Sequence, residues 1–143
     1  RQWRWRIWVT LTVPLVWSLH FTMLFIPIGL GLLSLHFFGA NITLSTAIHS
    51  LTVGAIGGMI LAMMSRVSLG HTGRMLQVGK LMSVAFFAIV ISAIVRSIAL
   101  AIWPQWTIQF WVLAGCLWCL AFGLFFFKYL PVLSAPRVDG RPG

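Results

Sequence analysis

Apolar residues form four long blocks along the chain, and short segments containing polar residues, proline or glycine separate them. The blocks cover about residues 7–38, 45–65, 78–102 and 107–129. A helix needs about 20 apolar residues to cross the hydrocarbon core of a bilayer, so each block predicts one transmembrane helix. The pattern therefore predicts an all-α, polytopic transmembrane bundle over residues 1–130. A short polar tail, predicted to be disordered, follows at 131–143.

Prolines divide or end several of these blocks. Pro14 and Pro27 interrupt the first block, which is longer than a bilayer requires. It is therefore expected to tilt or to kink at residues 26–32. Trp103-Pro104 is predicted to end the third helix, and Leu130-Pro131 the fourth.

Charge adds an orientation to this picture. Hydrophobic residues make up 60% of the chain and charged residues 8%, far below the roughly 25% of soluble domains. The ten Lys and Arg residues lie mostly between the apolar blocks rather than in one patch, which argues against nucleic-acid binding. Nine of them fall at the two termini and in the second connection, whereas the other two connections carry none. By the positive-inside rule, both termini are predicted to be cytoplasmic.

A stripe of small residues marks the second block. Ser50, Gly54, Gly58 and Ala62 recur every four residues, and such stripes let helix backbones approach closely in membranes. The stripe predicts a helix–helix contact, either within this chain or with another chain. The alternative is that glycine is simply frequent in membrane helices.

Histidines within the blocks are the first candidates for chemistry, because ionisable groups at membrane depth are costly. His20 would lie about 18 Å into a helix that starts at Ile7, near the midplane. It could ligate a metal or haem, or it could bond to a carbonyl or hydroxyl group of a neighbouring helix. His36 and His49 are expected at similar depths near the outer face. They could share a metal or be solvated by lipid headgroups.

Arg96 and the two cysteines are the remaining polar candidates inside the blocks. Arg96 could snorkel outward, or it could face the bundle and pair with an anion such as a haem propionate. No acid lies in any block, since Asp139 is the only acidic residue of the chain. Cys116 and Cys119 share a helix face and are interpreted as small packing residues rather than a zinc or redox site.

The segment Gly70-His71-Thr72-Gly73-Arg74 predicts a turn after the second helix. Gly70 is expected to cap the helix and Gly73 to adopt a positive φ. Backbone N–H groups beside His71 and Arg74 could hold an anion, or the turn could be purely structural. Paired carboxylates, a nucleotide-binding loop and a Ser-His-Asp order are all missing from the sequence, so a hydrolase or a carboxylate-driven proton pump is hard to build from it.

Residues 49–74 resemble the signature of the NnrS family. That signature is His-x-x-x-x-Gly-Ala-x-Gly, followed by Met-x-Leu-Ala-x-Met-x-Arg-x-Ser-Leu-Gly-His-Thr-Gly-Arg, and His49 to Arg74 match it throughout. Residues 15–20, 27–30 and 136–143 are also similar to the family. Members are longer bacterial membrane proteins that bind haem and copper, so the resemblance implies that this chain is a C-terminal portion of an inner-membrane, multi-pass protein.

The resemblance implies a role in the nitric oxide response, nitrosative stress and denitrification. It raises His20, His49 and His71 as metal ligands, and His20, His49 and Arg96 as haem-binding residues. It also singles out the turn residues Arg66, Gly70, Thr72, Gly73 and Arg74. His49 and His71 are separated by a helix length and are not expected to share a metal. Binding or sequestration is as compatible with these features as catalysis. A transporter or channel bundle and a scaffold subunit without a cofactor remain alternatives.

Overall fold

The computed structural model describes residues 10–140, and every regular element within them is helical. Several of the labels mark local changes of helix type within one longer helix. The elements are α2 (Pro14–Phe37), α3 (Leu44–His49), the π-helix η2 (Ser50–Gly57), α4 (Gly58–His71), α5 (Lys80–Ile94), the π-helix η3 (Val95–Ala99), α6 (Leu100–Ile102), the 3₁₀ turn η4 (Pro104–Trp106) and α7 (Thr107–Leu133).

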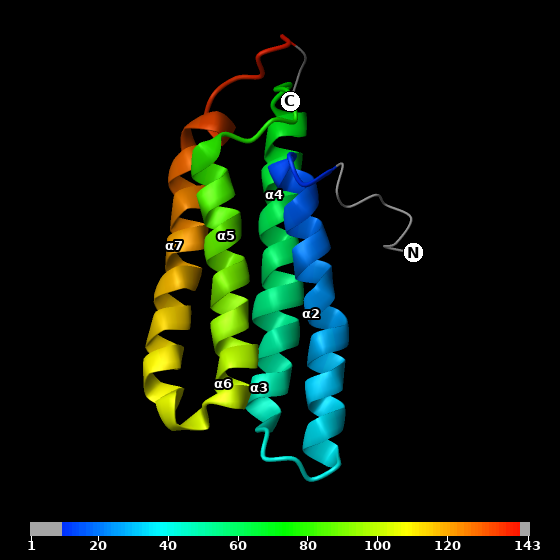
Figure 1. Cartoon of the computed structure of the whole chain (residues 1–143). Coiled ribbons are helices and arrows are strands. Elements are labelled where there is room, and N and C mark those ends of the chain that lie inside the picture. Colours follow the sequence, from blue (N-terminus) through cyan, green and yellow to red (C-terminus); the bar gives the residue numbers. More distant parts are fainter. Residues whose placement is uncertain (1–9, 141–143) are drawn as a thin grey trace.

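These elements make four helices that are long and apolar enough to cross a membrane, as predicted. The second is continuous over Leu44–His71 and the third over Lys80–Ile102. The helices run alternately up and down, so α2 begins and α7 ends at the same end of the bundle (Figure 1). This agrees with the predicted even number of crossings. The cytoplasmic placement of that end stays a prediction.

The observed helix ends differ from the predicted ones. Helix α2 begins at Pro14, because proline suits the first turn, where its missing N–H would be unpaired anyway. It continues through Pro27 as one helix. The second helix runs past Ser65 to His71. The predicted start at Ile7 and the N-terminal arginines and tryptophans lie outside the described residues.

The prediction that Pro131 ends the last helix is wrong. Helix α7 continues to Leu133, so the tail begins at Ser134, three residues later than predicted. The Leu130 carbonyl accepts from the Ser134 N–H at 3.0 Å and from Ser134 Oγ at 2.8 Å. A proline this close to a helix end removes a single backbone hydrogen bond, and the last turn closes around it.

The small-residue stripe packs against α2 within this chain, which confirms the predicted helix contact. A Cβ atom added at Gly54 would lie 2.7 Å from Phe25 Cβ, and one at Gly58 would lie 2.9 Å from Thr22 Cβ. Ser50 Oγ donates to the Phe25 carbonyl at 3.3 Å, and Ala62 is buried. The two helices therefore approach as closely as their backbones allow.

The π-helix η2 helps to keep this stripe on one face. In an α-helix, four residues overshoot one turn by about 40°, so a spacing of four drifts around the helix. The wider π turn, with its i→i+5 bonding, lowers the rotation per residue and opposes that drift. Ser50 and Gly54 lie within η2, and Gly58 follows it directly. All three consequently face α2.

Helix α5 is the central helix, and α7 lies at the side of the bundle (Figure 1). Ser92 Oγ of α5 donates to the Ala114 carbonyl of α7 at 2.8 Å, and Phe86, Ile89 and Ala93 are buried. Cys116 and Cys119, expected as packing residues, are both exposed on α7. That expectation is wrong within the described chain, because neither cysteine is buried against another helix; Cys119 borders an open cavity instead.

Candidate functional site

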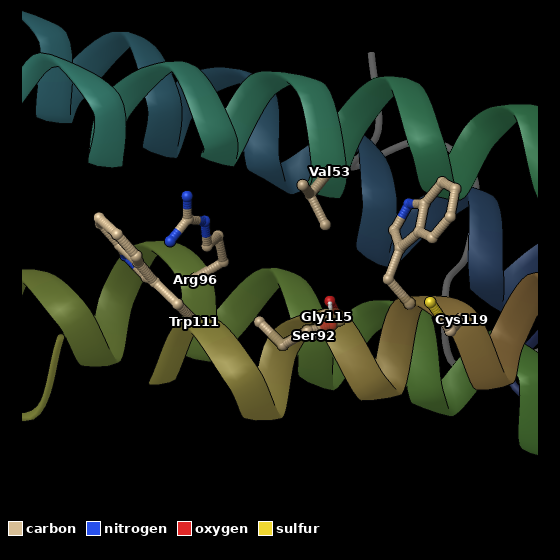
Figure 2. A pocket seen from close by; sticks show the side chains of 8 residues that line it. Val53, Ser92, Arg96, Trp111, Gly115 and Cys119 are labelled. Carbon is tan, nitrogen blue, oxygen red and sulfur yellow. Dashed lines mark hydrogen bonds between the residues drawn. The ribbon is translucent and has the colours of Figure 1, made fainter. Parts of the chain in front are cut away.

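A cavity of about 340 Å³ lies between the second helix, the third helix and α7. Val53 lines it from η2, Ser92 and Arg96 from the third helix, and Trp111, Trp118 and Cys119 from α7. Figure 2 shows Arg96 reaching from its helix toward the second helix, with Trp111 beside it. The cavity lies toward the end of the bundle where His49 is found, and its walls are apolar except near Arg96 and Ser92.

Arg96 faces the bundle rather than snorkelling outward. Its Nη2 donates to His49 Nε2 at 3.1 Å, and its Cζ lies 4.8 Å from the centroid of the Trp111 ring. The second guanidinium nitrogen, Nη1, is buried and has no hydrogen-bond partner among residues 10–140. A cation–π contact and one hydrogen bond thus hold the cation, and one donor remains available for a ligand.

The hydrogen bonds of His49 determine its tautomer. Nδ1 lies 2.6 Å from the Ser45 carbonyl oxygen, which can only accept, so the ring proton is on Nδ1. Ser45 Oγ lies 3.3 Å from the same nitrogen. Nε2 therefore carries the lone pair, and Arg96 donates to it. A carbonyl that orients one nitrogen while the other points at a site is the usual arrangement around a ligating histidine.

The charge of Arg96 has no counter-ion within the described structure. Asp139, the only acid of the chain, is in the tail that follows α7, at the opposite end of the bundle. An unpaired cation at membrane depth is costly, and functional anions commonly offset that cost. The site is therefore suited to an anionic ligand or to the anionic edge of a cofactor.

Both π-helices lie at this site. Segment η2 begins directly after His49, and η3 contains Arg96. A π turn inserts an extra residue into a helix and redirects the side chains around it, and such turns are frequent at functional sites. The sequence gives no clear signal for them. It does contain one pattern that indicates the cavity. Trp111 and Trp118 flank the small residues Ala114 and Gly115 on one face of α7, and this leaves a space between the two indole rings.

His20 is buried, and it lies nearer to the start of its helix than predicted. Because α2 starts at Pro14, His20 lies only about 9 Å from the start of the helix instead of 18 Å. Its Nε2 lies 3.1 Å from Thr10 Oγ1, a hydroxyl just before its own helix. Two residues later, Thr22 packs on Gly58, which is roughly 13 Å along the second helix from His49. His20 and His49 therefore cannot ligate one ion.

The other two histidines also stand apart. His36 Nδ1 lies 2.7 Å from the Ile42 carbonyl and ties the loop after α2 to the helix, so its role here is structural. His71 is exposed in the last turn of α4, roughly 30 Å from His49 along the helix axis. In the part of the chain that the structure describes, no three His, Cys, Asp or Glu side chains form a metal-binding group.

The turn after α4 closes the helix with a Schellman motif. Gly73 has φ +71°, as predicted; its N–H donates to the Gly70 carbonyl at 3.2 Å, and the Arg74 N–H donates to the Leu69 carbonyl at 2.9 Å. Gly70 is inside the helix, so its predicted role as cap is wrong. Thr72 Oγ1 also bonds back, to the Ser68 carbonyl at 2.7 Å. These N–H groups are occupied, which removes the predicted backbone anion site.

The tail contacts this turn instead of extending away from it. The Val138 N–H donates to the Thr72 carbonyl at 3.3 Å, and Asp139 lies directly over Gly73. Arg137 binds Asp139 through Nε at 2.9 Å and through Nη2 at 2.6 Å. Hydrogen bonding to the carboxylate raises the pKa of Arg137. The described part of the tail is thus held at the end of α4, contrary to the prediction of a disordered tail.

Comparison with known proteins gives one match. A family model described as NnrS protein matches residues 1–137, which include all four helices, the cavity and the turn. No curated protein and no solved structure matches the chain.

Proposed function

The chain belongs to the NnrS family, and on that premise we propose that it is part of a haem- and copper-binding protein of the bacterial inner membrane. Family membership indicates a function related to the nitric oxide response. The proposal adds the two cofactors and a contribution to denitrification and to resistance against nitrosative stress. Bound haem iron or copper would supply the coordination site for nitric oxide.

The observation that supports the proposal best is the fixed orientation of His49. Its Nδ1–H is held by the Ser45 carbonyl, and its Nε2 lone pair points toward Arg96, which lines the cavity. Neutral imidazole is a good ligand for both copper and haem iron. Of the histidines in the described residues, His49 best combines this orientation with a neighbouring cavity.

Arg96 fits the same interpretation through its unpaired donor. Its Nη1 is buried without a hydrogen-bond partner in the described structure, and a propionate carboxylate would accept from it. In the present structure, Arg96 occupies His49 Nε2. For His49 to ligate a metal, Arg96 must therefore release Nε2 and turn to another acceptor. A carboxylate next to Trp111 would provide that acceptor and neutralise the buried charge.

The cavity sets a limit on what this chain does alone. A volume of about 340 Å³ is at the lower end of the range for small-molecule sites. A haem macrocycle would extend beyond it, toward the exposed face of α7, and further helices would have to complete its pocket. His20 lies too far from His49 to join this site, so it would serve a second site.

The first experiment is an absorption spectrum of the detergent-purified protein, reduced and oxidised, with metal analysis on the same sample. We expect a Soret band and bound metal, and we expect His49→Ala to lose the band. His36→Gln is the matched control, because His36 is engaged with the Ile42 carbonyl. A featureless, metal-free protein despite haem supply during expression would overturn the proposal. In that case a solute-flux assay in proteoliposomes would test the transporter alternative. If no flux were found, the alternative of a scaffold subunit without a cofactor would remain.

A further inference from the structure

We propose that a notch at the other end of the second helix binds the headgroup of an anionic glycerophospholipid. One acyl chain of the lipid would lie along the outer face of α4. The notch has a volume of about 310 Å³ and is lined by Arg66, His71, Arg137, Met63, Val67 and Leu76. Cationic and apolar side chains thus share one small site at the end of a membrane-spanning helix. It is separate from the cavity at His49.

The positive charge of Arg66 in the notch is not neutralised by any acidic side chain of the described residues. Asp139 is the only acid, and Arg137 already binds it at 2.6 Å. Arg66 and His71 are exposed and form no hydrogen bond or ion pair within residues 10–140. The guanidinium of Arg66 therefore needs an anion from outside, and a phosphate is the anion that arginine binds with the best geometry.

Below the cations, the face of α4 is apolar. Met63 and Val67 line the notch, and Ile60 and Ile56 continue toward the middle of the helix. These four residues follow helical spacing, so they form one stripe, and all four are exposed. An exposed apolar stripe that leads directly from a cationic notch matches the shape of a phospholipid, with the headgroup at one end and an acyl chain below.

The depth of Arg66 supports a lipid rather than a soluble anion. Arg66 precedes His71 by five residues, so its Cα lies roughly 7.5 Å deeper along the helix axis. Its long side chain can lie along apolar surface and raise the guanidinium to the level of the phosphate groups. His71, in the last turn of α4, and Arg137 also line the notch. A free phosphate would contact only the cations and would leave the stripe below uncovered.

Native mass spectrometry of the delipidated protein in detergent tests the proposal. The probes are phosphatidylglycerol, phosphatidylcholine with the same acyl chains, and inorganic phosphate. We expect phosphatidylglycerol to bind at least several-fold more tightly than phosphatidylcholine. Arg66→Gln should weaken phosphatidylglycerol roughly fivefold, the effect expected for one basic residue near an anionic lipid. Met63→Gln should weaken the lipid but not phosphate, because it changes only the stripe.

Lys80→Gln is the matched control. It removes one positive charge from the same end of the bundle, at the start of α5, but Lys80 does not line the notch. We expect it to bind phosphatidylglycerol like the unchanged protein. Equal losses in Arg66→Gln and Lys80→Gln would mean that general charge, not the notch, attracts the lipid. Equal binding of the two lipids, or phosphate competing fully with phosphatidylglycerol, would also overturn the proposal. Cofactor spectra are recorded separately, so this result is independent of the His49 site.

Discussion

The two ends of the second helix use the same residue types in opposite ways. At one end, His49 and Arg96 bond to each other at 3.1 Å beside a cavity. At the other end, His71 and Arg66 lie around a notch without hydrogen bonds within the described residues. Both pairs are a histidine and an arginine, and three of these four residues, all except Arg96, lie in the segment His49–Arg74 that resembles the family signature.

The difference comes from the surroundings of each pair. Arg96 reaches into the bundle from another helix, where water is scarce, so its donors must find protein or ligand partners. Arg66 and His71 are on the outside of the same helix near its end, where water and headgroups can solvate them. The comparison teaches that burial decides how a histidine and an arginine are satisfied in a membrane protein: the buried pair is bonded to each other, and the exposed pair is left to water and headgroups.

The largest expected effect is on stability, and it comes from the contact between Gly58 of the second helix and Thr22 of α2. Gly58→Ala would place a Cβ against Thr22, whose hydroxyl is held by the Ser18 carbonyl at 2.9 Å, so Thr22 cannot easily turn away. We expect the free energy of unfolding to fall by roughly 1–3 kcal/mol, as for overpacked cores. Thermal unfolding in detergent measures the change, and both ligand sites should weaken together.

Gly31→Ala is the control for this substitution. Gly31 is inside α2, and nothing lies within 4 Å of a Cβ added there. The free energy of unfolding of the Gly31→Ala variant should stay the same or rise slightly. A loss as large as that of Gly58→Ala would show that glycine in these helices matters for some reason other than close packing.

An intermediate effect should separate the two ends. Gly73→Ala forces an alanine to φ +71° and places its Cβ 2.8 Å from Asp139 Cγ. We expect a loss of about 1–2 kcal/mol from the left-handed conformation, together with weaker phosphatidylglycerol binding but an unchanged cofactor spectrum. Gly70→Ala, three residues earlier, should not lower the free energy of unfolding, because Gly70 is helical and a Cβ added there would meet nothing within 4 Å. Equal effects of the two substitutions would contradict the Schellman motif.

The smallest effect concerns the tail. Asp139→Asn removes the bidentate ion pair with Arg137, which is exposed. We expect only a small fall in the free energy of unfolding, and we expect it to shrink in high salt, because solvent screens an exposed ion pair. A double-mutant cycle with Arg137→Gln, measured by thermal unfolding, isolates the pair. A loss as large as that of Gly58→Ala would mean that the tail is a main support of α4.

Sequence reasoning identified the helices and most candidate residues, but not how they meet. The apolar blocks predicted four helices, and the small-residue stripe predicted a helix contact that the structure confirms. His20 lies nearer to the start of its helix than the apolar block predicts, because α2 starts at Pro14, inside that block. His49 and Arg96 were both candidates, yet nothing in their separation of 47 residues indicated that they bond to each other.

By itself, the sequence determined that this protein folds in a lipid bilayer, that it forms four long helices, and which ionisable side chains it contains. Apolar blocks must bury their backbone polar groups as helices in a bilayer, and a chain with a single acid offers few ways to neutralise a buried cation. Only the tertiary structure decided that Arg96 meets His49 and Trp111, that Gly73 rather than Gly70 closes α4, and that the tail returns to Thr72. These contacts depend on helix phase and on two π turns, and a shift of one residue rotates a side chain by about 100°.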